Sequence, residues 1–289
     1  MDDILATTSC PIKINTTLHV LARRNDGYHD IYSLFWKKYA TEVLTISTKS
    51  DENTCDDLNV CGADIKGPNL VMQVIEAARM LYGSLPPLSV ELVKRFPTGS
   101  GVGAGSGNAA GMIAWLREYL ALSDERSVFA KLGADIAFLS GRNDMALVSG
   151  IGEKIEPLNR KLDLIWVLVF PAWRSGTAEA YAKLDRYRAL NEMALPASDF
   201  RGEAFEILGK LLRKERVGLL PNDFLQPLAE EHEEYAAAGH IAADSGALGW
   251  GLCGSGSAYF ALCRDISEAE RLSSKFKRQN WVTQTNIVE

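Results

Sequence analysis

The sequence has no apolar run that would cross a membrane. Its longest strongly apolar stretch, residues 164–173, is interrupted by Pro171 and has about half of the roughly 20 residues that span a bilayer. The start of the chain, Met1-Asp2-Asp3, lacks the positive residues and apolar core of a signal peptide. We therefore expect a cytoplasmic protein without a membrane partner.

Residues that form disulfides or hold metals are also scarce. The chain contains 5 cysteines, an odd number, and no two of them form a Cys-x-x-Cys pair. This spacing favours reduced thiols and gives no zinc site. No dedicated carboxylate cluster is evident either, so the sequence predicts no metal ligand of its own.

An excess of positive charge is missing as well. The chain has 31 Lys and Arg against 37 Asp and Glu, which gives a net charge of -6 at pH 7. Nucleic-acid binding requires a basic face, and basic clusters such as Lys37-Lys38 and Arg213-Lys214 are short enough to be solvated surface. We expect no nucleic-acid partner, although a small phosphorylated ligand needs only a local anion site.

What is present is a globular composition in which strand and helix patterns alternate. The 289 residues are 47% hydrophobic and 24% charged, enough for one large core or two modest ones. Apolar runs predict strands at 43–47, 88–96 and 163–170, and a strand–loop–strand at 252–263. Helical spacing predicts helices at 69–81, 108–122, 178–190, 200–213 and 267–279. The expected class is α+β, and the turn-rich segment Ser149-Gly150-Ile151-Gly152 predicts domains 1–152 and 153–289.

Three of the predicted helix ends carry capping signals. Gly83 follows the helix at 69–81 as a C-terminal stop. Ser267 and Glu270 have capping-box spacing at the start of the last helix. Asn108 is predicted to cap the helix that follows a glycine-rich loop.

That glycine-rich loop is the strongest local signal. It reads Pro97-Thr98-Gly99-Ser100-Gly101-Val102-Gly103-Ala104-Gly105-Ser106-Gly107-Asn108 and lies between a strand pattern and a helix pattern. Without Cβ atoms, successive backbone N–H groups can surround an anion, and the following helix adds donors and the positive end of its dipole. Ser100 and Ser106 offer hydroxyls to phosphate oxygens or to a phosphate-bound Mg²⁺.

Two better-known phosphate loops do not fit this segment. A Walker A loop ends in Gly-Lys-Ser/Thr, and a Rossmann loop requires a ribose-binding acid about 20 residues further on. The alternative to a phosphate loop is a flexible glycine linker, but linkers rarely lead directly into an amphipathic helix.

The loop resembles the second motif of the GHMP kinases. Two N-terminal segments, Pro11-Ile12-Lys13-Ile14-Asn15 and Arg24-Asn25-Asp26-Gly27-Tyr28-His29, are similar to segments of the diphosphocytidyl-methylerythritol kinases. The run Asp-Gly-Tyr-His is the specific part, since other GHMP kinases lack it. Further matches follow in the family's order over nearly the whole chain: Asn69-Leu70, Gly133-Ala134-Asp135, Gly150-Ile151-Gly152-Glu153, Thr177-Ala178-Glu179-Ala180-Tyr181, Asn222-Asp223-Phe224 and Gly251-Leu252-Cys253-Gly254-Ser255-Gly256-Ser257.

The resemblance implies a GHMP kinase fold, with an N-terminal domain of the ribosomal-protein-S5 type and a C-terminal ferredoxin-like domain. It also implies transfer of the γ-phosphoryl group of ATP, accompanied by Mg²⁺, to the 2-hydroxyl of a small cytidyl substrate. Such a reaction depends mostly on positioning and charge stabilisation, and the alcohol needs a proton acceptor. No signal defines the oligomeric state, and we expect a monomer or a weak homodimer.

On this resemblance, Asp135 is the general base, and Lys13 beside it keeps the carboxylate ionised and offsets negative charge. Tyr28 and Tyr181 clamp the cytosine, and His29 reads its edge. The remaining substrate contacts are Asn15, Thr177 and Phe35. The nucleotide contacts are Asn69 and Leu70 near the adenine, with Lys94 close to that pocket, and Pro97, Gly99, Ser100, Gly101, Gly103, Ala104, Gly105, Ser106, Gly107 and Asn108 around the phosphates.

Each of these residues also has a purely structural explanation. An aspartate after Gly133 can be a cap or turn residue, single aromatic residues are more often part of a core, and the third glycine-rich motif is compatible with a tight hairpin. The chain departs from the family pattern at Ala104, Gly107 and Ala137, where glycine, serine and proline are usual. The stretch between Asn108 and Asp135 is also several residues shorter than usual.

Two alternatives to a cytidyl-substrate kinase remain open. One is a different GHMP kinase, acting on homoserine or a mevalonate derivative. It would leave Asp-Gly-Tyr-His unexplained, because its substrate has no base to clamp. The other is a nucleotide-binding protein without turnover, which the altered loop would permit.

Overall fold

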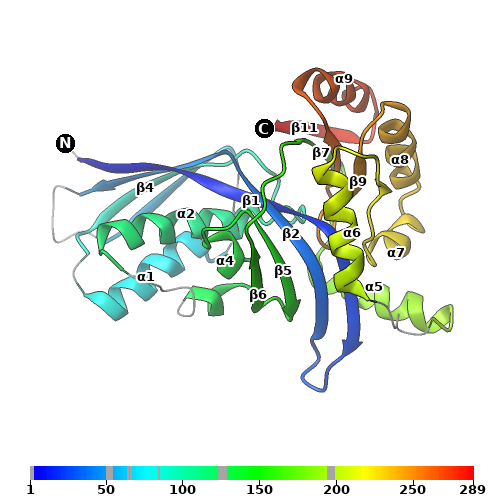
Figure 1. Ribbon diagram of the computed structural model, residues 1–289. Helices are drawn as coiled ribbons and strands as arrows, with labels where there is room; N and C mark the ends of the chain where they lie inside the picture. The colour runs from blue at the N-terminus through cyan, green and yellow to red at the C-terminus, as the bar shows by residue number, and fades with distance from the viewer. Residues whose placement is uncertain are drawn as a thin grey trace. The chain divides into compact units, whose positions relative to one another are not determined.

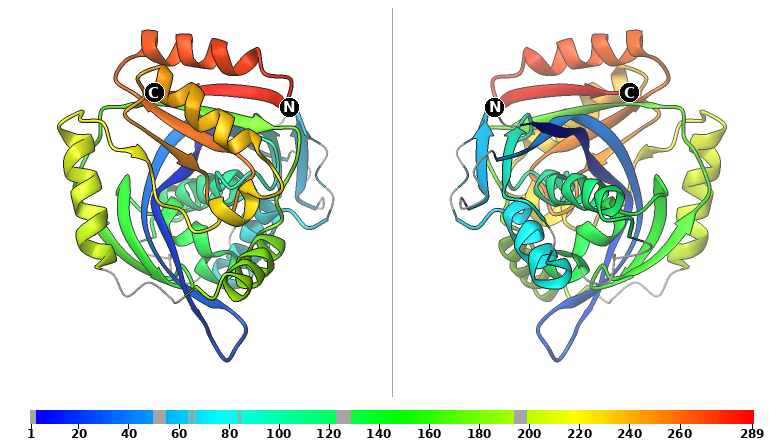
Figure 2. Two further views of the ribbon diagram at one scale, coloured as in Figure 1. Left: turned by 90° about the vertical axis from the view of Figure 1, so that its right-hand side faces the viewer. Right: turned by 90° about the vertical axis from the view of Figure 1, so that its left-hand side faces the viewer.

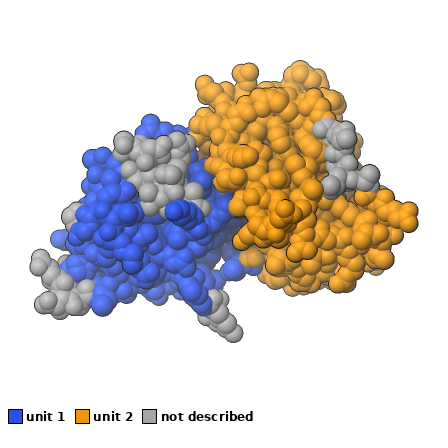
Figure 3. Space-filling view, turned by 90° about the horizontal axis from the view of Figure 1, so that it is seen from below, with its two compact units in different colours: residues 1–12, 39–98, 103–142 blue, residues 13–38, 99–102, 143–289 orange. Residues whose placement is uncertain are grey.

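The computed structural model describes residues 3–49, 55–63, 65, 67–83, 85–122, 129–193 and 199–289. The chain forms two compact units, coloured separately in Figure 3. The first consists of residues 1–12, 39–98 and 103–142, and the second of residues 13–38, 99–102 and 143–289. Two strands of 20 residues, β1 (Ile4–Arg23) and β2 (His29–Thr48), contribute residues to both units.

The first unit contains a small sheet with helices packed against it (Figure 1). The last part of β2 pairs antiparallel with β4 (Leu88–Val93), and β4 pairs parallel with β3 (Asp57–Cys61). The helical segments are α1 (Leu70–Tyr82), α2 (Ala104–Tyr119), the short α4 (Ala134–Leu139) and a 3-10 turn (Ala130–Leu132).

The core of the first unit lies between this sheet and helices α1 and α2. Apolar residues alternate along the strands, so that one face of each strand is buried. The buried members are Leu44 and Ile46 from β2, Leu88, Val90 and Leu92 from β4, Val71, Val74, Ile75 and Ala78 from α1, and Met112, Ile113 and Leu116 from α2. The predicted strands at 43–47 and 88–96 are therefore confirmed, apart from the last residues of the second.

Helix α1 begins and ends where its sequence predicts. The side chain of Asn69 accepts a hydrogen bond from the backbone N–H of Val71 at 2.9 Å, which satisfies one donor of the first turn. Gly83 adopts φ 68° and donates its N–H to the carbonyl of Arg79 at 3.0 Å. The predicted glycine stop is confirmed, because this left-handed conformation favours glycine.

The second unit contains two sets of strands. The first part of β2 pairs antiparallel with β5 (Met145–Gly150), which pairs with β6 (Lys154–Leu158). A separate five-stranded sheet has the order β11-β7-β10-β9-β8. Its strands are β7 (Ile165–Pro171), β8 (Gly218–Leu219), β9 (Gly249–Leu252), β10 (Tyr259–Cys263) and β11 (Val282–Val288).

The helices described in the second unit are α5 (Thr177–Leu190), α6 (Phe200–Leu212), α7 (Leu225–Ala229), α8 (Glu234–Asp244) and α9 (Ile266–Lys277). Helices α8 and α9 lie side by side on the five-stranded sheet (Figure 2). The predicted strand at 163–170 corresponds to β7, which lies between β10 and β11 and is buried from Trp166 to Pro171. Burial along its length explains why it reads as a continuous apolar run.

Two predicted helix caps are wrong. Helix α2 begins at Ala104 with Gly103 as its N-cap, so Asn108 lies inside the helix and its side chain bonds to Glu42 and Lys94 instead. Helix α9 begins at Ile266, and the side chain of Asp265 accepts from the N–H of Glu268 at 2.8 Å. In both cases the helix begins earlier than predicted. Gly103, with a left-handed backbone, precedes α2, and Asp265, with an extended backbone, precedes α9.

The α+β class and the predicted helices at 178–190 and 200–213 are confirmed, as is the strand–loop–strand at 252–263. The sequence patterns did not reveal the alanine-rich α8 or the polar strand β11. All 5 cysteines are free, as expected for reduced thiols. Among the described residues, none of the helices has the length and apolar character needed to cross a bilayer.

Candidate active site

In the second unit, Lys13 and Asn15 lie two residues apart on β1, so their side chains emerge on the same face of the strand. Lys13 is only 5% exposed, and its Nζ donates to Asn15 Oδ1 at 3.0 Å. The amide of Asn15 in turn donates to Ser33 Oγ at 2.9 Å. The ring of Phe35 lies 4.9 Å from the Lys13 ammonium, a distance at which cation–π attraction operates. Three predicted site residues, Lys13, Asn15 and Phe35, are thus brought together.

The third glycine-rich motif touches this group through its backbone. The N–H of Gly254 donates to Asn15 Oδ1 at 3.1 Å, so the same oxygen accepts from both Gly254 and Lys13. Cys253 is fully buried, and burial raises the pKa of its thiol far above the usual range. That thiol is therefore neutral and adds no negative charge beside Lys13.

The same motif also holds the first part of the phosphate loop, residues 99–102. The carbonyl of Ser100 accepts from the N–H of Ala258 at 3.0 Å, and the carbonyl of Val102 accepts from the N–H of Lys13 at 2.9 Å. At Gly101, which has φ 85°, an added Cβ would lie 1.8 Å from the carbonyl oxygen of Cys253. Only glycine permits this approach, so the two glycine-rich motifs depend on each other.

In the first unit, the loop enters helix α2 with its backbone donors uncapped. Gly103 is the N-cap, with φ 69° and no side chain that bonds the first turn. A Cβ at Gly105 would meet nothing within 4 Å, so a ligand can approach the backbone closely there. Open space beside uncapped N–H groups at a helix N-terminus is the arrangement that suits phosphate oxygens. Binding of a triphosphate at this loop stays a prediction, which this geometry supports.

A buried polar network holds the start of α2 from behind. Lys94 Nζ donates to Glu42 Oε2 at 2.7 Å and to Asn108 Oδ1 at 2.9 Å, and Asn108 Nδ2 donates to Glu42 Oε2 at 2.7 Å. The remaining oxygen of Glu42 accepts from the N–H groups of Arg95 and Phe96, each at 2.9 Å. Asn108 is therefore engaged by protein groups, and Glu42 is a site-supporting residue that no sequence pattern indicated.

Asp135 lies in the first turn of α4 and is partly buried. The turn begins at Gly133, where an added Cβ would lie 3.8 Å from Ser106 Oγ of the phosphate loop. The N–H of Ile136 closes the turn by donating to the carbonyl of Gly133 at 3.1 Å. The first unit thus brings the turn that carries Asp135 next to Ser106 of the phosphate loop.

Two residues predicted to bind the substrate, His29 and Tyr181, contact each other in the second unit. The ring of His29 stacks on Tyr181 with centroids 5.0 Å apart and planes at 22°, and its Nε2 lies 2.8 Å from Asp185 Oδ1. Tyr28, in contrast, is 62% exposed, and no ring contact between it and another described residue is present. Its N–H bonds to Asp26 Oδ1 at 3.1 Å, which confirms the predicted turn at Asp26-Gly27.

Thr177 begins helix α5 and contacts the third glycine-rich motif. Its Oγ1 lies 3.2 Å from Ser255 Oγ, and Ser175 Oγ donates to the carbonyl of Ser255 at 2.9 Å. Thr177 therefore belongs to the same unit as Lys13 and His29. Asn69 and Leu70, predicted near the adenine, lie at the start of α1 in the first unit, where Asn69 serves as the cap described above.

Sequence reasoning missed several residues that bond to the predicted ones. Asp185 binds His29 and Ser33 binds Asn15, and neither residue was assigned a role from the sequence. Only the partner's position in space reveals them. No group of three or more His, Cys, Asp or Glu residues that would hold a metal ion is found within the described part of the chain.

Comparisons with known proteins now identify the class. Residues 69–150 match the GHMP kinases N terminal domain, and residues 197–282 match the GHMP kinases C terminal domain. The fold agrees: a crystal structure of homoserine kinase from Cytophaga hutchinsonii superposes with a TM-score of 0.64 at 18% identity, covering 96% of this chain and 94% of that one. The fold and the glycine-rich loop define a phosphotransferase of the GHMP kinase class, and the predicted fold class is confirmed.

More similar relatives narrow the assignment. The 4-diphosphocytidyl-2-C-methyl-D-erythritol kinase of Porphyromonas gingivalis is 34% identical over 273 residues, which cover 90% of this chain and 92% of the relative. The kinase of the same name from Chlorobaculum tepidum is 29% identical over 278 residues, or 92% and 93% of the two chains. A crystal structure of 4-(cytidine 5'-diphospho)-2C-methyl-D-erythritol kinase has a TM-score of 0.80 at 26% identity and covers 98% of both chains. This chain belongs to the 4-diphosphocytidyl-2-C-methyl-D-erythritol kinase family.

Proposed function

We propose that this chain transfers the γ-phosphoryl group of ATP to the 2-hydroxyl of 4-diphosphocytidyl-2-C-methyl-D-erythritol, in the methylerythritol phosphate route to isoprenoid precursors. The observation that carries the proposal is the geometry of His29, the last residue of Asp-Gly-Tyr-His. This ring is 7% exposed, stacks on Tyr181 and bonds through Nε2 to Asp185. A ring held in this way is suited to recognising a base.

The bond to Asp185 also determines what His29 offers a ligand. A carboxylate only accepts hydrogen bonds, so Nε2 carries the hydrogen that it donates to Asp185. In the neutral ring, Nδ1 then remains as an acceptor. The exocyclic amino group of cytosine is a donor on the base edge, which matches this acceptor. Tyr181 and Tyr28 supply aromatic faces for the pyrimidine.

We assign the chemical roles by residue type. Asp135 accepts the proton of the attacking hydroxyl, and the Lys13 ammonium offsets negative charge on the reacting oxygens. The uncapped N–H groups at the start of α2 bind phosphate oxygens, with hydroxyls from Ser100 and Ser106. If ATP binds with Mg²⁺, the hydroxyls of Ser100 and Ser106 would be the protein groups available to the ion, which would supply positive charge to offset that of the phosphates. Asn15 and Thr177 bind polar groups of the substrate, and Phe35 lines the site beneath Lys13.

We propose that the enzyme acts in the cytoplasm, where ATP is available, as a monomer or weak homodimer without a nucleic-acid partner. We also propose domains 1–152 and 153–289, since the two matched family regions, 69–150 and 197–282, fall on either side of that division.

A coupled assay of ADP release tests the function. ATP and Mg²⁺ are supplied with the cytidyl substrate, with homoserine, with mevalonate or with no acceptor. We expect turnover with the cytidyl substrate alone. Turnover with homoserine or mevalonate in its place would assign the chain to another GHMP kinase activity, and nucleotide binding without turnover on any acceptor would remove the enzymatic proposal.

A further inference from the structure

The segment Asn222-Asp223-Phe224 has no role in the reaction as proposed so far, although each of its side chains makes a defined contact. We infer that this segment is a positioning element that holds Lys13 through Asn222 and holds Tyr181 through Phe224. The inference rests on the proposed function for its kinetic consequences. Its structural basis lies within the second unit alone.

Asn222 uses both hydrogens of its amide to hold the third glycine-rich motif. Its Nδ2 donates to the carbonyls of Leu252 at 3.1 Å and Gly254 at 2.9 Å, and its Oδ1 accepts from the N–H of Phe224 at 3.0 Å. Gly254 then donates its N–H to Asn15 Oδ1, the oxygen that also accepts from Lys13 Nζ. Three successive hydrogen bonds therefore connect Asn222 to the ammonium of Lys13.

Phe224 packs against Tyr181, one of the aromatic residues proposed to bind the pyrimidine. It is 1% exposed, and its ring meets Tyr181 edge to face, with centroids 4.9 Å apart and planes at 86°. Tyr181 is the residue on which His29 stacks. Since edge-to-face pairs have a preferred geometry, Phe224 fixes the plane that Tyr181 presents to His29.

Asp223 ties the segment to the strand that carries Lys13. Its Oδ2 accepts from the N–H of Val20 at 2.8 Å and from Arg188 at 2.7 Å, and its own N–H donates to the carbonyl of Leu18 at 3.0 Å. Leu18 donates its N–H to Pro221 at 2.9 Å, so the segment runs alongside β1. Pro221 and Asp223, on either side of Asn222, are therefore held by hydrogen bonds that do not involve Asn222.

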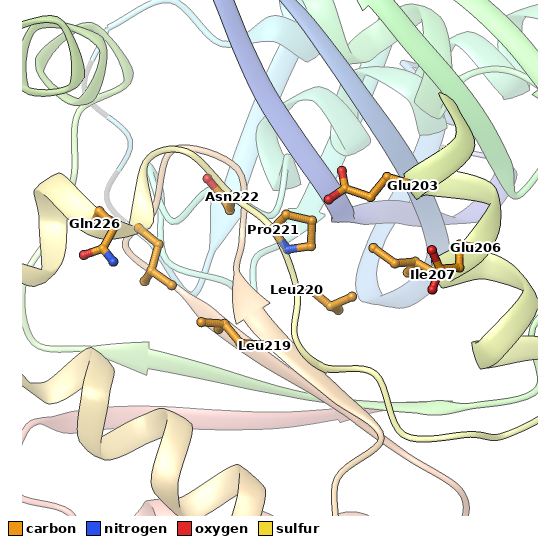
Figure 4. A pocket seen from close by; sticks show the side chains of 9 residues that line it. Glu203, Glu206, Ile207, Leu219, Leu220, Pro221, Asn222 and Gln226 are labelled. Atoms are coloured by element: carbon orange, nitrogen blue, oxygen red, sulfur yellow. The ribbon is translucent and has the colours of Figure 1, made fainter. Parts of the chain in front are cut away.

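Beside the segment lies a cavity of about 410 Å³, in which Pro221 and Asn222 form part of the wall (Figure 4). Two glutamates face it, but Glu203 is bonded to His19 and Glu206 to Lys210. Because space rather than packed side chains lies on this side, the position of Asn222 depends on its hydrogen bonds. Removing these hydrogen bonds should therefore also displace their acceptors, Leu252 and Gly254.

The first test compares Asn222→Ala with Asn191→Ala, which removes an exposed amide bonded only to the carbonyl of Tyr187. Asn222→Ala should lower kcat about 10- to 100-fold, because small displacements of a catalytic group cost that much. The KM for ATP and for the cytidyl substrate should change less than about 3-fold. Asn222→Asp, which faces two carbonyl oxygens with a carboxylate, should be at least as impaired. Asn191→Ala should behave as the wild type.

The second test uses Phe224→Leu, with the exposed Phe205→Leu as its control. Loss of the edge contact should raise the KM for the cytidyl substrate about 3- to 10-fold and leave kcat within about 2-fold, since an aromatic pair contributes modestly. Two residues of the same three-residue segment, Asn222 and Phe224, would then affect different kinetic constants. A merely structural segment would lower the fraction of active enzyme in both variants, which reduces the apparent kcat of both and leaves their KM values unchanged. A Phe224→Leu enzyme with a lowered kcat and an unchanged KM for the cytidyl substrate would therefore overturn the inference.

Amide hydrogen exchange of the wild type and Asn222→Ala separates this inference from the proposed reaction. Faster exchange in the peptide containing Gly254 is expected, because its acceptor Asn15 loses alignment. This readout needs no turnover, so it tests the connection even if the chain proves inactive on the cytidyl substrate. Unchanged exchange at Gly254, together with an unchanged kcat where activity is measurable, would show that Asn222 does not position Lys13.

Discussion

Lys94 and Glu42 form a buried ion pair, with Nζ and Oε2 2.7 Å apart and side chains 3% and 0% exposed. Glu42 also accepts from two backbone N–H groups ahead of the phosphate loop, those of Arg95 and Phe96. In Glu42→Ala the Lys94 ammonium stays buried without its carboxylate, which should lower the free energy of unfolding by about 3–5 kcal/mol. Urea unfolding measures the loss. Glu206→Ala, which removes an exposed ion pair with Lys210, is the control and should leave the midpoint unchanged.

Two glycines of the phosphate loop should respond in opposite ways to a side chain. A Cβ at Gly105 meets nothing within 4 Å, whereas one at Gly107 would lie 1.7 Å from the carbonyl oxygen of Pro11. Gly105→Ala should keep or slightly raise stability, since alanine favours a helix by about 0.5–1 kcal/mol, but should raise the KM for ATP. Gly107→Ser, although it restores the serine usual in the family, should destabilise the fold by about 1–3 kcal/mol. A Gly105→Ala enzyme with unchanged ATP affinity would place the triphosphate elsewhere.

Asp135→Asn keeps the size of the side chain and removes its ability to take a proton. We expect kcat to fall by about 10²- to 10⁴-fold, the range attributed to general acid–base catalysis, while nucleotide and substrate binding by calorimetry persist. Asp163→Asn, at a side chain that is 96% exposed, serves as the matched control. Retention of full activity by Asp135→Asn would remove the assignment of the base.

His29→Ala should raise the KM for the cytidyl substrate much more than that for ATP. The variant loses both the ring that stacks on Tyr181 and the Nδ1 acceptor, which together correspond to about 10- to 100-fold in substrate affinity. His240→Ala, at an exposed position on α8, controls for loss of a histidine. Equal changes in both KM values, or none, would contradict recognition of the cytosine by His29.

The stability contributed by His19 should depend on pH. Burial of the ring opposes protonation, but hydrogen bonds to Asp223 and Glu203 outweigh it and raise the pKa of His19 above its usual 6.5. Its other neighbours are Phe200, on which it stacks, and Arg188, which bonds Asp223. A raised pKa in the folded state stabilises the fold below the unfolded pKa, and the gain disappears as pH rises through the folded value.

The measurement compares unfolding of the wild type and His19→Gln between about pH 5.5 and pH 9. We expect the wild type to be the more stable at the acidic end, with the difference narrowing as pH rises. His240→Gln should show a constant difference. A gap between the wild type and His19→Gln that widens toward alkaline pH would reverse the sign of the argument.

Local sequence patterns predicted most of the helices and strands but few of the tertiary contacts between them. The apolar stripe of α1 and its flanking Asn69 and Gly83 determine a helix through contacts within a few residues, so its ends were predicted correctly. The start of α2 was predicted wrongly, because Gly103 takes a left-handed conformation there and the helix begins after it. Asn108 lies inside the helix and bonds to Glu42 and Lys94, which its local sequence does not reveal. Strand β11 is polar because it lies at the edge of its sheet, so its sequence carries little of the usual strand signal.

The sequence by itself determined the class of chemistry, because residue type and order are enough to define a phosphate loop, a candidate base and a base-recognising segment. Only the tertiary structure decided which atoms meet: that Asn15 shares one oxygen between Lys13 and Gly254, and that Tyr181 receives His29 on one side and Phe224 on another. Hydrogen bonds and ring contacts depend on distances of a few ångströms between residues remote in the chain. Those distances are set by how β1, α5 and the glycine-rich motifs pack in the second unit, and no local pattern encodes them.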